Sequence, residues 1–121
     1  MRAVLDTNVL IDFLQGVPAA QAEIQRYTPA GISVITWMEV MAGARRPEEE
    51  PTLRAFLADF AVHPLSFPVA ARAAQLRREH RIRLPDAVIW ATAVERGELL
   101  VTRNTRDFPE GDPGVRVPYR I

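Results

Sequence analysis

The side chains best suited to chemistry in this sequence are acidic residues that follow apolar segments. Asp6 comes directly after a short apolar run, and Glu39 lies a few residues beyond a β-branched run. Asp86 precedes an apolar segment of helical spacing, and Asn104 and Asp107 follow a third apolar run. In an open α/β sheet the carboxyl ends of parallel strands share one edge, where ligands bind. We therefore expect these side chains to converge, Asp86 only if its helix begins at that edge.

Three carboxylates brought together at this edge would repel one another, and loss of water would raise their pKa values. A divalent cation would relieve both effects. The chain has no cysteine, and its two histidines, His63 and His80, lie away from the acidic positions. Oxygen ligands alone suit Mg²⁺ or Mn²⁺ rather than Zn²⁺. Such a site activates water and stabilises charge on a phosphoryl group.

Each acidic residue also has a simpler structural interpretation. Glu39 follows Thr36 at the spacing of a capping box, in which both side chains bond the first turn of a helix. Asp86 fits the first turn of a helix, where the helix dipole favours a negative charge. Asp107 fits a turn or cap. Capping explains Asp6 least well.

The elements that must position these residues alternate between strands and helices, which predicts an α/β fold with a parallel sheet covered on both faces. Strands are expected at residues 3–5, 32–35, 61–65, 98–102 and 115–117. The strand at 61–65 contains Pro64, which predicts an edge position. Helices are expected at 9–14, 19–27, 36–45, 52–60, 68–80 and 87–96. We expect one domain spanning residues 1–121.

The composition excludes several classes of protein. The formal net charge is zero, which argues against an extended basic surface for duplex nucleic acid. All 15 basic residues are arginine, whereas receiver domains and haloacid-dehalogenase-like phosphatases need a lysine. No apolar run approaches the roughly 20 residues that span a bilayer, and the start lacks the marks of a signal peptide. We expect a cytoplasmic protein.

Four motifs taken together resemble a PIN-domain ribonuclease, and more narrowly the VapC-type toxins of VapBC toxin–antitoxin pairs. They are Leu5-Asp6-Thr7-Asn8-Val9, Glu39 with Thr36 before it, Leu84 to Ala93, and Leu100 to Phe108. The resemblance covers essentially the whole chain. It implies a three-layer α/β/α fold with a mainly parallel sheet of four or five strands. It also implies RNA cleavage that depends on Mg²⁺ or Mn²⁺, neutralisation by a cognate antitoxin, and a homodimer.

The resemblance also implies roles for single residues. Asp6, Glu39 and Asp86 match the acids that bind metal in this family. Thr7 and Asn8 match the polar residues that hold the first acid and face the substrate. The fourth acidic position of the family falls on Asn104, which brings no charge. Asp107, three residues later, could compensate if the turn is helical, so both belong to the expected catalytic set.

Arginines surround these motifs and suit contacts with phosphate groups. Arg81 and Arg83 end a basic run just before Asp86, and Thr102 and Arg103 follow the strongest strand. We expect these four residues to bind the RNA substrate. The run before Asp86 also fits a solvated helix end. His80 is interpreted as a surface residue.

Two alternatives remain open at this point. One is a housekeeping PIN nuclease in RNA processing, and the other is a non-catalytic binding module whose site has decayed at Asn104. An antitoxin would need an apolar surface on this chain. The residues named next could form that surface, although ordinary core packing is the simpler explanation for them. That surface is expected on the first and third helices, at Phe13, Leu14, Trp37, Met38 and Met41. Trp90 is interpreted as a core residue.

Overall fold

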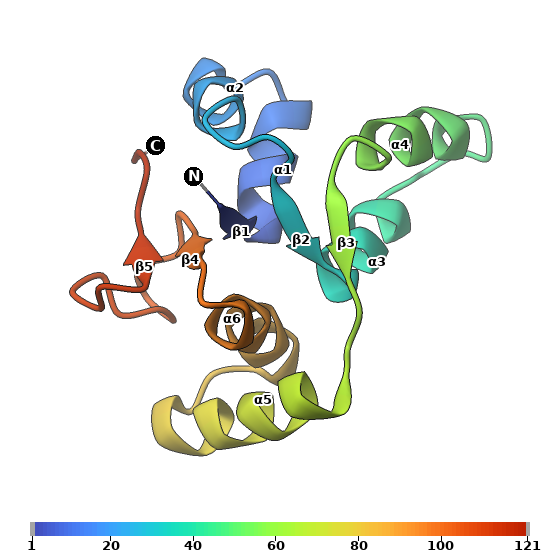
Figure 1. Ribbon diagram of the computed structural model, residues 1–121. Coiled ribbons are helices and arrows are strands. Elements are labelled where there is room, and N and C mark those ends of the chain that lie inside the picture. Colours follow the sequence, from blue (N-terminus) through green and yellow to red (C-terminus); the bar gives the residue numbers. More distant parts are fainter. Residues whose placement is uncertain (1, 121) are drawn as a thin grey trace.

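The computed structural model describes residues 2–120 and contains five strands and six helices within them (Figure 1). The strands are β1 (Ala3–Leu5), β2 (Gly31–Ser33), β3 (Ala61–His63), β4 (Leu99–Val101) and β5 (Val115–Arg116). The helices are α1 (Thr7–Leu14), α2 (Pro18–Ile24), α3 (Val34–Ala42), α4 (Glu49–Leu57), α5 (Phe67–His80) and α6 (Leu84–Arg96). None of these helices has the length and apolar character needed to cross a membrane.

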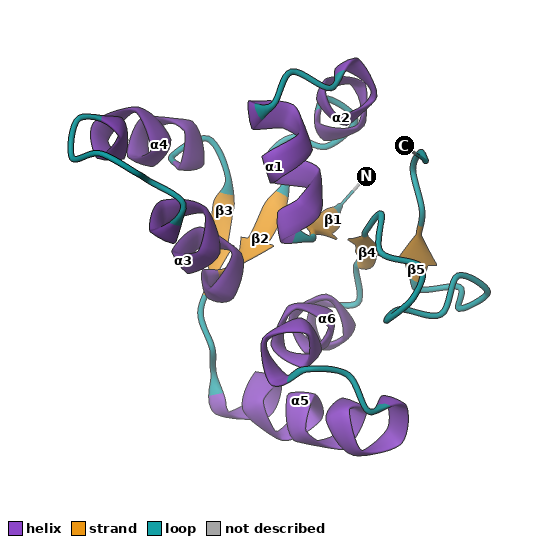
Figure 2. Cartoon of the chain, turned by 180° about the vertical axis from the view of Figure 1, so that it is seen from behind, coloured by secondary structure: helices purple, strands orange, loops and turns teal. Residues whose placement is uncertain are grey.

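The five strands form one sheet in the order β3-β2-β1-β4-β5, and every neighbouring pair is parallel. Helices α5 and α6 cover one face, and α1 to α4 lie on the other (Figures 1 and 2). This is the expected three-layer α/β/α architecture. The strand expected at residues 61–65 is β3, which ends at His63 just before Pro64. It lies at the sheet edge, as expected.

Two apolar cores lie on the two faces of the sheet. Val4 and Leu100 point toward α5 and α6, and their core includes Ala73 and Ile89. The residues that alternate with them, such as Leu5, point toward α1 to α4. Successive side chains of a strand face opposite sides, so the central strands β1 and β4 are buried on both faces. A buried central sheet gives a rigid edge on which side chains can be placed.

The central position of β1 brings two distant segments together. Residues Leu5 and Val101 are paired in register across β1 and β4. The backbone N–H of Asp6 then donates to the carbonyl oxygen of Val101 at 2.8 Å. The residues that follow the two strands, Asp6 and Thr102, therefore leave the sheet side by side.

The boundary between β2 and α3 differs from the expectation at 32–35. The strand ends at Ser33 and the helix begins at Val34. The hydroxyl of Ser33 accepts a 3.0 Å hydrogen bond from the backbone N–H of Ile35 and so caps the helix. The predicted capping box of Thr36 and Glu39 is therefore wrong, because both residues lie inside the helix.

Several helix ends also differ from the sequence prediction. Helix α1 begins at Thr7 without a separate turn, and α6 begins at Leu84. Helix α4 begins at Glu49 rather than at the expected residue 52, and it therefore includes the acidic residues Glu49 and Glu50. Acidic side chains favour the first turn of a helix, and this explains the earlier start of α4.

The aromatic residues near α6 support the fold rather than the site. Trp90 is 3% exposed, as expected for a core residue. Its ring packs edge-on against Phe108, with centroids 5.7 Å apart. The exposed His80 covers the same indole at 4.7 Å.

Candidate metal centre and its surroundings

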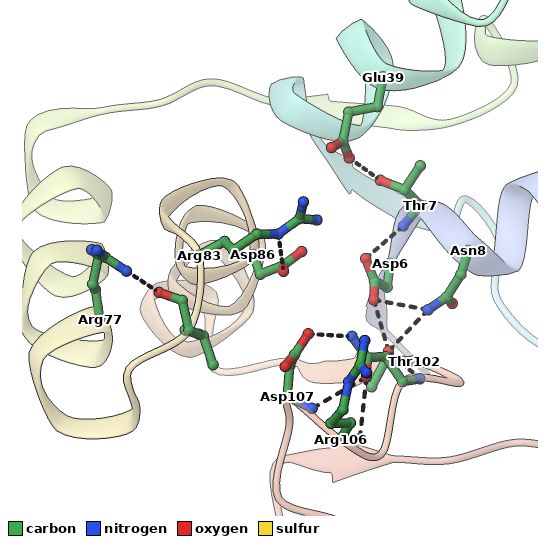
Figure 3. Close-up of polar contacts among 12 residues, drawn as sticks. Asp6, Thr7, Asn8, Glu39, Arg77, Arg83, Asp86, Thr102, Arg106 and Asp107 are labelled. Atoms are coloured by element: carbon green, nitrogen blue, oxygen red, sulfur yellow. Dashed lines mark hydrogen bonds and ion pairs between the residues drawn. The ribbon is translucent and has the colours of Figure 1, made fainter.

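A cavity of about 380 Å³ lies where β1 and β4 end and where α1 and α6 begin. Its lining includes Asp6, Glu39 and Asp86. Asp86 joins the other two because α6 does begin at this edge of the sheet (Figure 3). The other lining residues are Thr7, Asn8, Ile11, Arg83, Arg103 and Asn104. A larger cavity of about 830 Å³ is lined by none of these residues.

Asp6 is the most enclosed acid of the cavity, with only 4% of its surface exposed. One carboxylate oxygen accepts from the backbone N–H of Thr7 at 2.7 Å. The other accepts from the hydroxyl of Thr102 at 2.7 Å and from the amide of Asn8 at 3.2 Å. Three donors thus fix the orientation of this carboxylate.

Burial raises the pKa of Asp6 from 3.8 to about 6. The hydrogen bonds from Thr102 and Thr7 oppose this rise, because they favour the charged form. The negative charges of Asp86 and Glu39 add to it. The three acids therefore interact electrostatically across the cavity.

Glu39 reaches the cavity from the middle of α3. Its carboxylate accepts a 2.6 Å hydrogen bond from the hydroxyl of Thr7. The hydroxyl of the fully buried Thr36 lies 2.9 Å from the same Thr7 oxygen. A hydroxyl carries one proton and a carboxylate only accepts, so Thr36 donates to Thr7 and Thr7 donates to Glu39. This link from the core fixes the rotamer of Glu39.

Asp86 lies in the first turn of α6 and is 8% exposed. Burial raises its pKa, while the guanidinium of Arg83, 3.4 Å away, acts in the opposite direction. The negative charges of Asp107 and Glu39 raise the pKa further. Arg83 is thus the immediate counter-charge of Asp86.

The loop after β4 places Asn104 at the cavity and Asp107 behind it. The side-chain oxygen of Asn104 accepts from the backbone N–H groups of Arg106 and Asp107, at 3.1 and 3.2 Å. Its amide donates to the Asp107 carboxylate at 2.9 Å. Asp107 therefore acts on the cavity indirectly: its carboxylate holds the amide of Asn104, and its negative charge raises the pKa of Asp86.

The residues expected to bind substrate occupy different environments. Thr102 is fully buried and supports Asp6, so it offers the cavity no surface. Arg103 lines the cavity, but its guanidinium is turned toward Asp12. Arg83 lines the cavity with its side chain 77% exposed. Arg81 belongs instead to a separate hollow at the end of α5 that it shares with two other arginines, Arg77 and Arg78.

Sequence reasoning missed two buried residues next to the site, Asp12 and Thr36. Asp12 is 3% exposed, and its carboxylate accepts two hydrogen bonds from Arg103, at 2.7 and 3.0 Å. Its position one helical turn after Asn8, between apolar residues, was a signal available in the sequence. Thr36 was noticed only as a cap.

The acidic cavity offers the oxygen donors that a divalent cation requires. Among residues 2–120, no three histidine or acidic side chains are already arranged to hold an ion. Glu39 is bonded to Thr7 and Asp86 to Arg83. The three carboxylates nevertheless line one cavity, carry oxygen ligands only, and repel one another. This chemistry fits Mg²⁺ or Mn²⁺.

An apolar hollow of about 340 Å³ lies apart from the acidic cavity, among α1, α2 and α4. Phe13 lines it and stacks on Phe56, with ring centroids 5.2 Å apart. Of the five residues expected to form an apolar surface, the other four do not line this hollow. Leu14 and Met38 are exposed elsewhere, at 41% and 54%. The groove expected on α1 and α3 therefore stays a prediction, while Phe13 lines a hollow that it shares with residues of α2 and α4.

Comparison with known proteins gives a consistent result. The family model described as PIN domain matches residues 3–112. Ribonuclease VapC10 of Mycobacterium tuberculosis is 37% identical in an alignment of 114 residues that covers 88% of this chain and 85% of that protein. A chain in a toxin–antitoxin complex from Klebsiella pneumoniae is 43% identical, with a TM-score of 0.92 and coverage of 98% of this chain and 99% of that one. A chain in DNA-bound VapBC from Salmonella typhimurium is 28% identical, with a TM-score of 0.81 and 96% coverage of each.

Proposed function

This chain belongs to the PIN domain family, and on that premise we propose that it is a ribonuclease that uses Mg²⁺ or Mn²⁺ to cleave RNA phosphodiester bonds. One observation carries the proposal: Asp6, Glu39 and Asp86, from three distant segments, line the same cavity. The relatives named ribonuclease and toxin support the choice of RNA and of a toxin.

Asp6, Glu39 and Asp86 are the residues that would hold the cation. A divalent cation supplies Lewis acidity, which lowers the pKa of an attacking water and stabilises charge on the phosphate. At pH 7 Asp6 is mostly ionised, because its pKa of about 6 lies below that pH. Its three hydrogen bonds and the link from Thr7 to Glu39 hold both carboxylates in place, so little reorientation is needed during the reaction.

Asn104 and Asp107 complete the proposed catalytic set from the loop after β4. Asn104 can orient a water or a phosphate oxygen through its amide, which already points to Asp107 at 2.9 Å. Neither histidine lines the cavity. We therefore assign proton removal from the attacking water to the carboxylates rather than to an imidazole.

The RNA would meet positive charge beside the acids. Arg83 lies at the cavity with most of its side chain in solvent. Arg81, with Arg77 and Arg78, adds further positive surface at the end of α5, in a hollow separate from the cavity. We assign phosphate contacts on one side of the scissile bond to this surface, since such contacts position a nucleic acid without reading its sequence.

We further propose that a cognate antitoxin covers part of this chain. Solved relatives come from complexes described as toxin–antitoxin and VapBC. The apolar hollow beside Phe13 and Phe56 is suited to an apolar segment of such a partner. The proposal also places the protein in the cytoplasm, where its RNA substrate is found. It takes the protein to be a homodimer, as the family resemblance implies. Light scattering of the purified chain tests the dimer.

The experiment that tests the nuclease is cleavage of a pool of structured RNA by pure protein, with MnCl₂ or with EDTA. We expect cleavage with MnCl₂ and none with EDTA, and a loss of at least 100-fold in Asp86→Asn. Glu48→Gln is the matched control, because Glu48 is an exposed acid outside the cavity. If the wild type cleaved no RNA and bound no Mn²⁺, the result would contradict the proposal and would favour a non-catalytic binding module.

A further inference from the structure

Asp12 is a buried acid to which the proposed mechanism gives no role. Its side chain is 5% exposed, and both of its oxygens are occupied. Arg103 forms a bidentate pair with it, at 2.7 and 3.0 Å. The hydroxyl of Tyr119 donates to the same carboxylate at 2.8 Å. A buried charge is tolerated only when it is paired and hydrogen-bonded in this way.

The backbone of Arg103 continues from this ion pair toward the acidic cavity. Its N–H donates to the side-chain oxygen of Asn8 at 3.3 Å. An amide whose oxygen faces a donor must present its NH₂ group on the other side. That NH₂ group donates to Asp6 at 3.2 Å. The orientation of Asn8, and therefore its bond to Asp6, depends on where Arg103 is held.

The residues on either side of Arg103 are bonded to each other and to Asp6. Thr102 donates to Asp6 at 2.7 Å, and its oxygen accepts from the backbone N–H of Asn104 at 3.0 Å. The guanidinium of Arg103 is the group that ties this segment to α1, through Asp12.

We propose that Asp12 is a positioning residue for the candidate metal centre: by holding Arg103 it fixes the donor of Asn8 on Asp6. Tyr119 assists by bonding the same carboxylate, so the segment after β5 contributes to the geometry of the cavity. The proposal deepens the nuclease function and rests on it for its biological meaning. Groups that orient metal-ligating side chains typically change metal affinity or activity by about 10–100-fold when they are removed.

The chain contains an internal control for a purely structural role. Glu23 on α2 is also 5% exposed and forms a bidentate pair with Arg116, at 2.7 and 3.0 Å. The hydroxyl of Tyr27 donates to it at 2.8 Å. This second cluster has the same chemistry as the first but does not line the acidic cavity. The backbone carbonyl of Arg116 accepts from the N–H of Thr102 at 3.0 Å, so this cluster also adjoins the strand end, but its contacts do not include Asn8. The two clusters therefore differ in their connection to Asn8.

The test compares Asp12→Asn with Glu23→Gln in three measurements on the full chain. Thermal unfolding should show a comparable fall in Tm for both variants. Calorimetric titration with MnCl₂ should show binding weakened by about 10–100-fold in Asp12→Asn and unchanged within about twofold in Glu23→Gln. The NMR resonances of the Asn8 side-chain amide should move only in Asp12→Asn.

Milder variants keep the test decisive if Asp12→Asn does not fold. Tyr119→Phe and Tyr27→Phe each remove one hydroxyl and leave the ion pair in place. We expect Tyr119→Phe to weaken Mn²⁺ binding by a few-fold and to shift the Asn8 amide, and Tyr27→Phe to do neither.

Equal Mn²⁺ affinities and an unmoved Asn8 amide in the Asp12 and Tyr119 variants would overturn the positioning role. A wild type that binds no Mn²⁺ would count against the nuclease instead. In that case the Asn8 resonances, which need neither metal nor RNA, still decide the present proposal.

Discussion

The hydroxyl of Thr102 donates a 2.7 Å hydrogen bond to Asp6 across 96 residues of the chain. The parallel pairing of β1 and β4 makes this contact possible, because Leu5 and Val101 lie opposite each other in the sheet. The residues that follow the two strands then meet at the same level. The sheet register, and not a local motif, supplies the strongest side-chain support for the most buried acid of the cavity.

Replacing Asp6 should stabilise the metal-free protein at neutral pH. The pKa of Asp6 is raised to about 6 in the folded chain, so protonation favours folding, and stability falls as the pH rises from about 4 to about 6. The difference from its ordinary value of 3.8 corresponds to at most about 3 kcal/mol. The amide of the new asparagine places a donor against the donor of Asn8, which offsets part of this difference. We therefore expect Asp6→Asn to raise the free energy of unfolding by about 1–2 kcal/mol at pH 7.

Thermal unfolding in EDTA checks this expectation. The gain in Tm of Asp6→Asn over the wild type should be largest at pH 7 and should disappear near pH 4, where the wild-type carboxyl is protonated. Glu48→Gln should differ little from the wild type at either pH. A gain that is the same at both pH values would argue against a raised pKa of Asp6.

A bound divalent metal should stabilise the folded wild type, because the cation offsets the repulsion among the three acids of the cavity. A ligand at 100 times its Kd stabilises by about 2.7 kcal/mol, which corresponds to a rise in Tm of about 5–15 °C. We expect MnCl₂ to produce this rise and EDTA to reverse it. Asp86→Asn should lose most of the effect, and Glu48→Gln should retain it. An equal rise in Asp86→Asn would place the ion elsewhere.

The hydroxyl group of Thr7 should matter more for activity and stability than the size and shape of the Thr7 side chain. Thr7→Val keeps the size of the side chain but removes the donor to Glu39 and leaves the buried hydroxyl of Thr36 without its partner. We expect about a 10-fold loss in kcat for RNA cleavage and a loss of about 1–3 kcal/mol in stability. Thr7→Ser restores the hydroxyl and should stay close to the wild type. The link from Thr36 to Glu39 would be refuted if serine were as damaging as valine.

Arg83 should contribute to RNA binding through charge alone. In an Asp6→Asn background, which binds without cutting, Arg83→Gln should weaken the binding of a single-stranded RNA. It should also reduce the slope of log K against log salt by about 0.7. Arg46→Gln is the matched control, because the Arg46 side chain is 72% exposed and lies outside the cavity. An unchanged slope in Arg83→Gln would remove this residue from the phosphate path.

Restoring a carboxylate at position 104 should destabilise the loop after β4. In Asn104→Asp the 2.9 Å bond from the amide to Asp107 is replaced by two facing carboxylates. We expect a loss of about 1–3 kcal/mol at pH 7 and a much smaller loss at pH 4, where one carboxyl is protonated and can donate. Unfolding curves at the two pH values measure this. A stable variant at pH 7 with increased cleavage would show that position 104 acts as a fourth acid without help from Asp107.

The sequence was sufficient to predict the layers, the parallel sheet, and the edge at which Asp6 and Glu39 meet, whereas Asp86 was expected there only on the condition that its helix begins at that edge. Apolar runs that end in polar residues carry that information, because burial on both faces and strand direction follow from them. The start of α3 was not predictable from propensity, because Val34 and Ile35 favour strands while the hydroxyl of Ser33 caps a helix there. Tertiary contacts overrode the local preference.

The side-chain partners could not be predicted in the same way. No spacing rule links Asp12 to Arg103, because their 91-residue separation is closed by the sheet. The apolar hollow beside Phe13 could not be located from the sequence for a similar reason. Helical spacing identified Phe13 as a surface candidate, but only the packing of α4 shows that Phe56 stacks on its ring.

The strand order has a consequence for synthesis of the chain on the ribosome. Asp6 and Glu39 are translated early, yet the central strand that precedes Asp6 must wait for β4, which begins at Leu99. Long-range parallel pairing of this kind forms late, after the intervening chain is available. A nascent chain that ends before β4 would lack Thr102 and the whole loop that holds Asn8. A nuclease built in this order can assemble its site only after β4 and the loop that follows it have been synthesised, and a translation product truncated before β4 would lack these supports of Asp6.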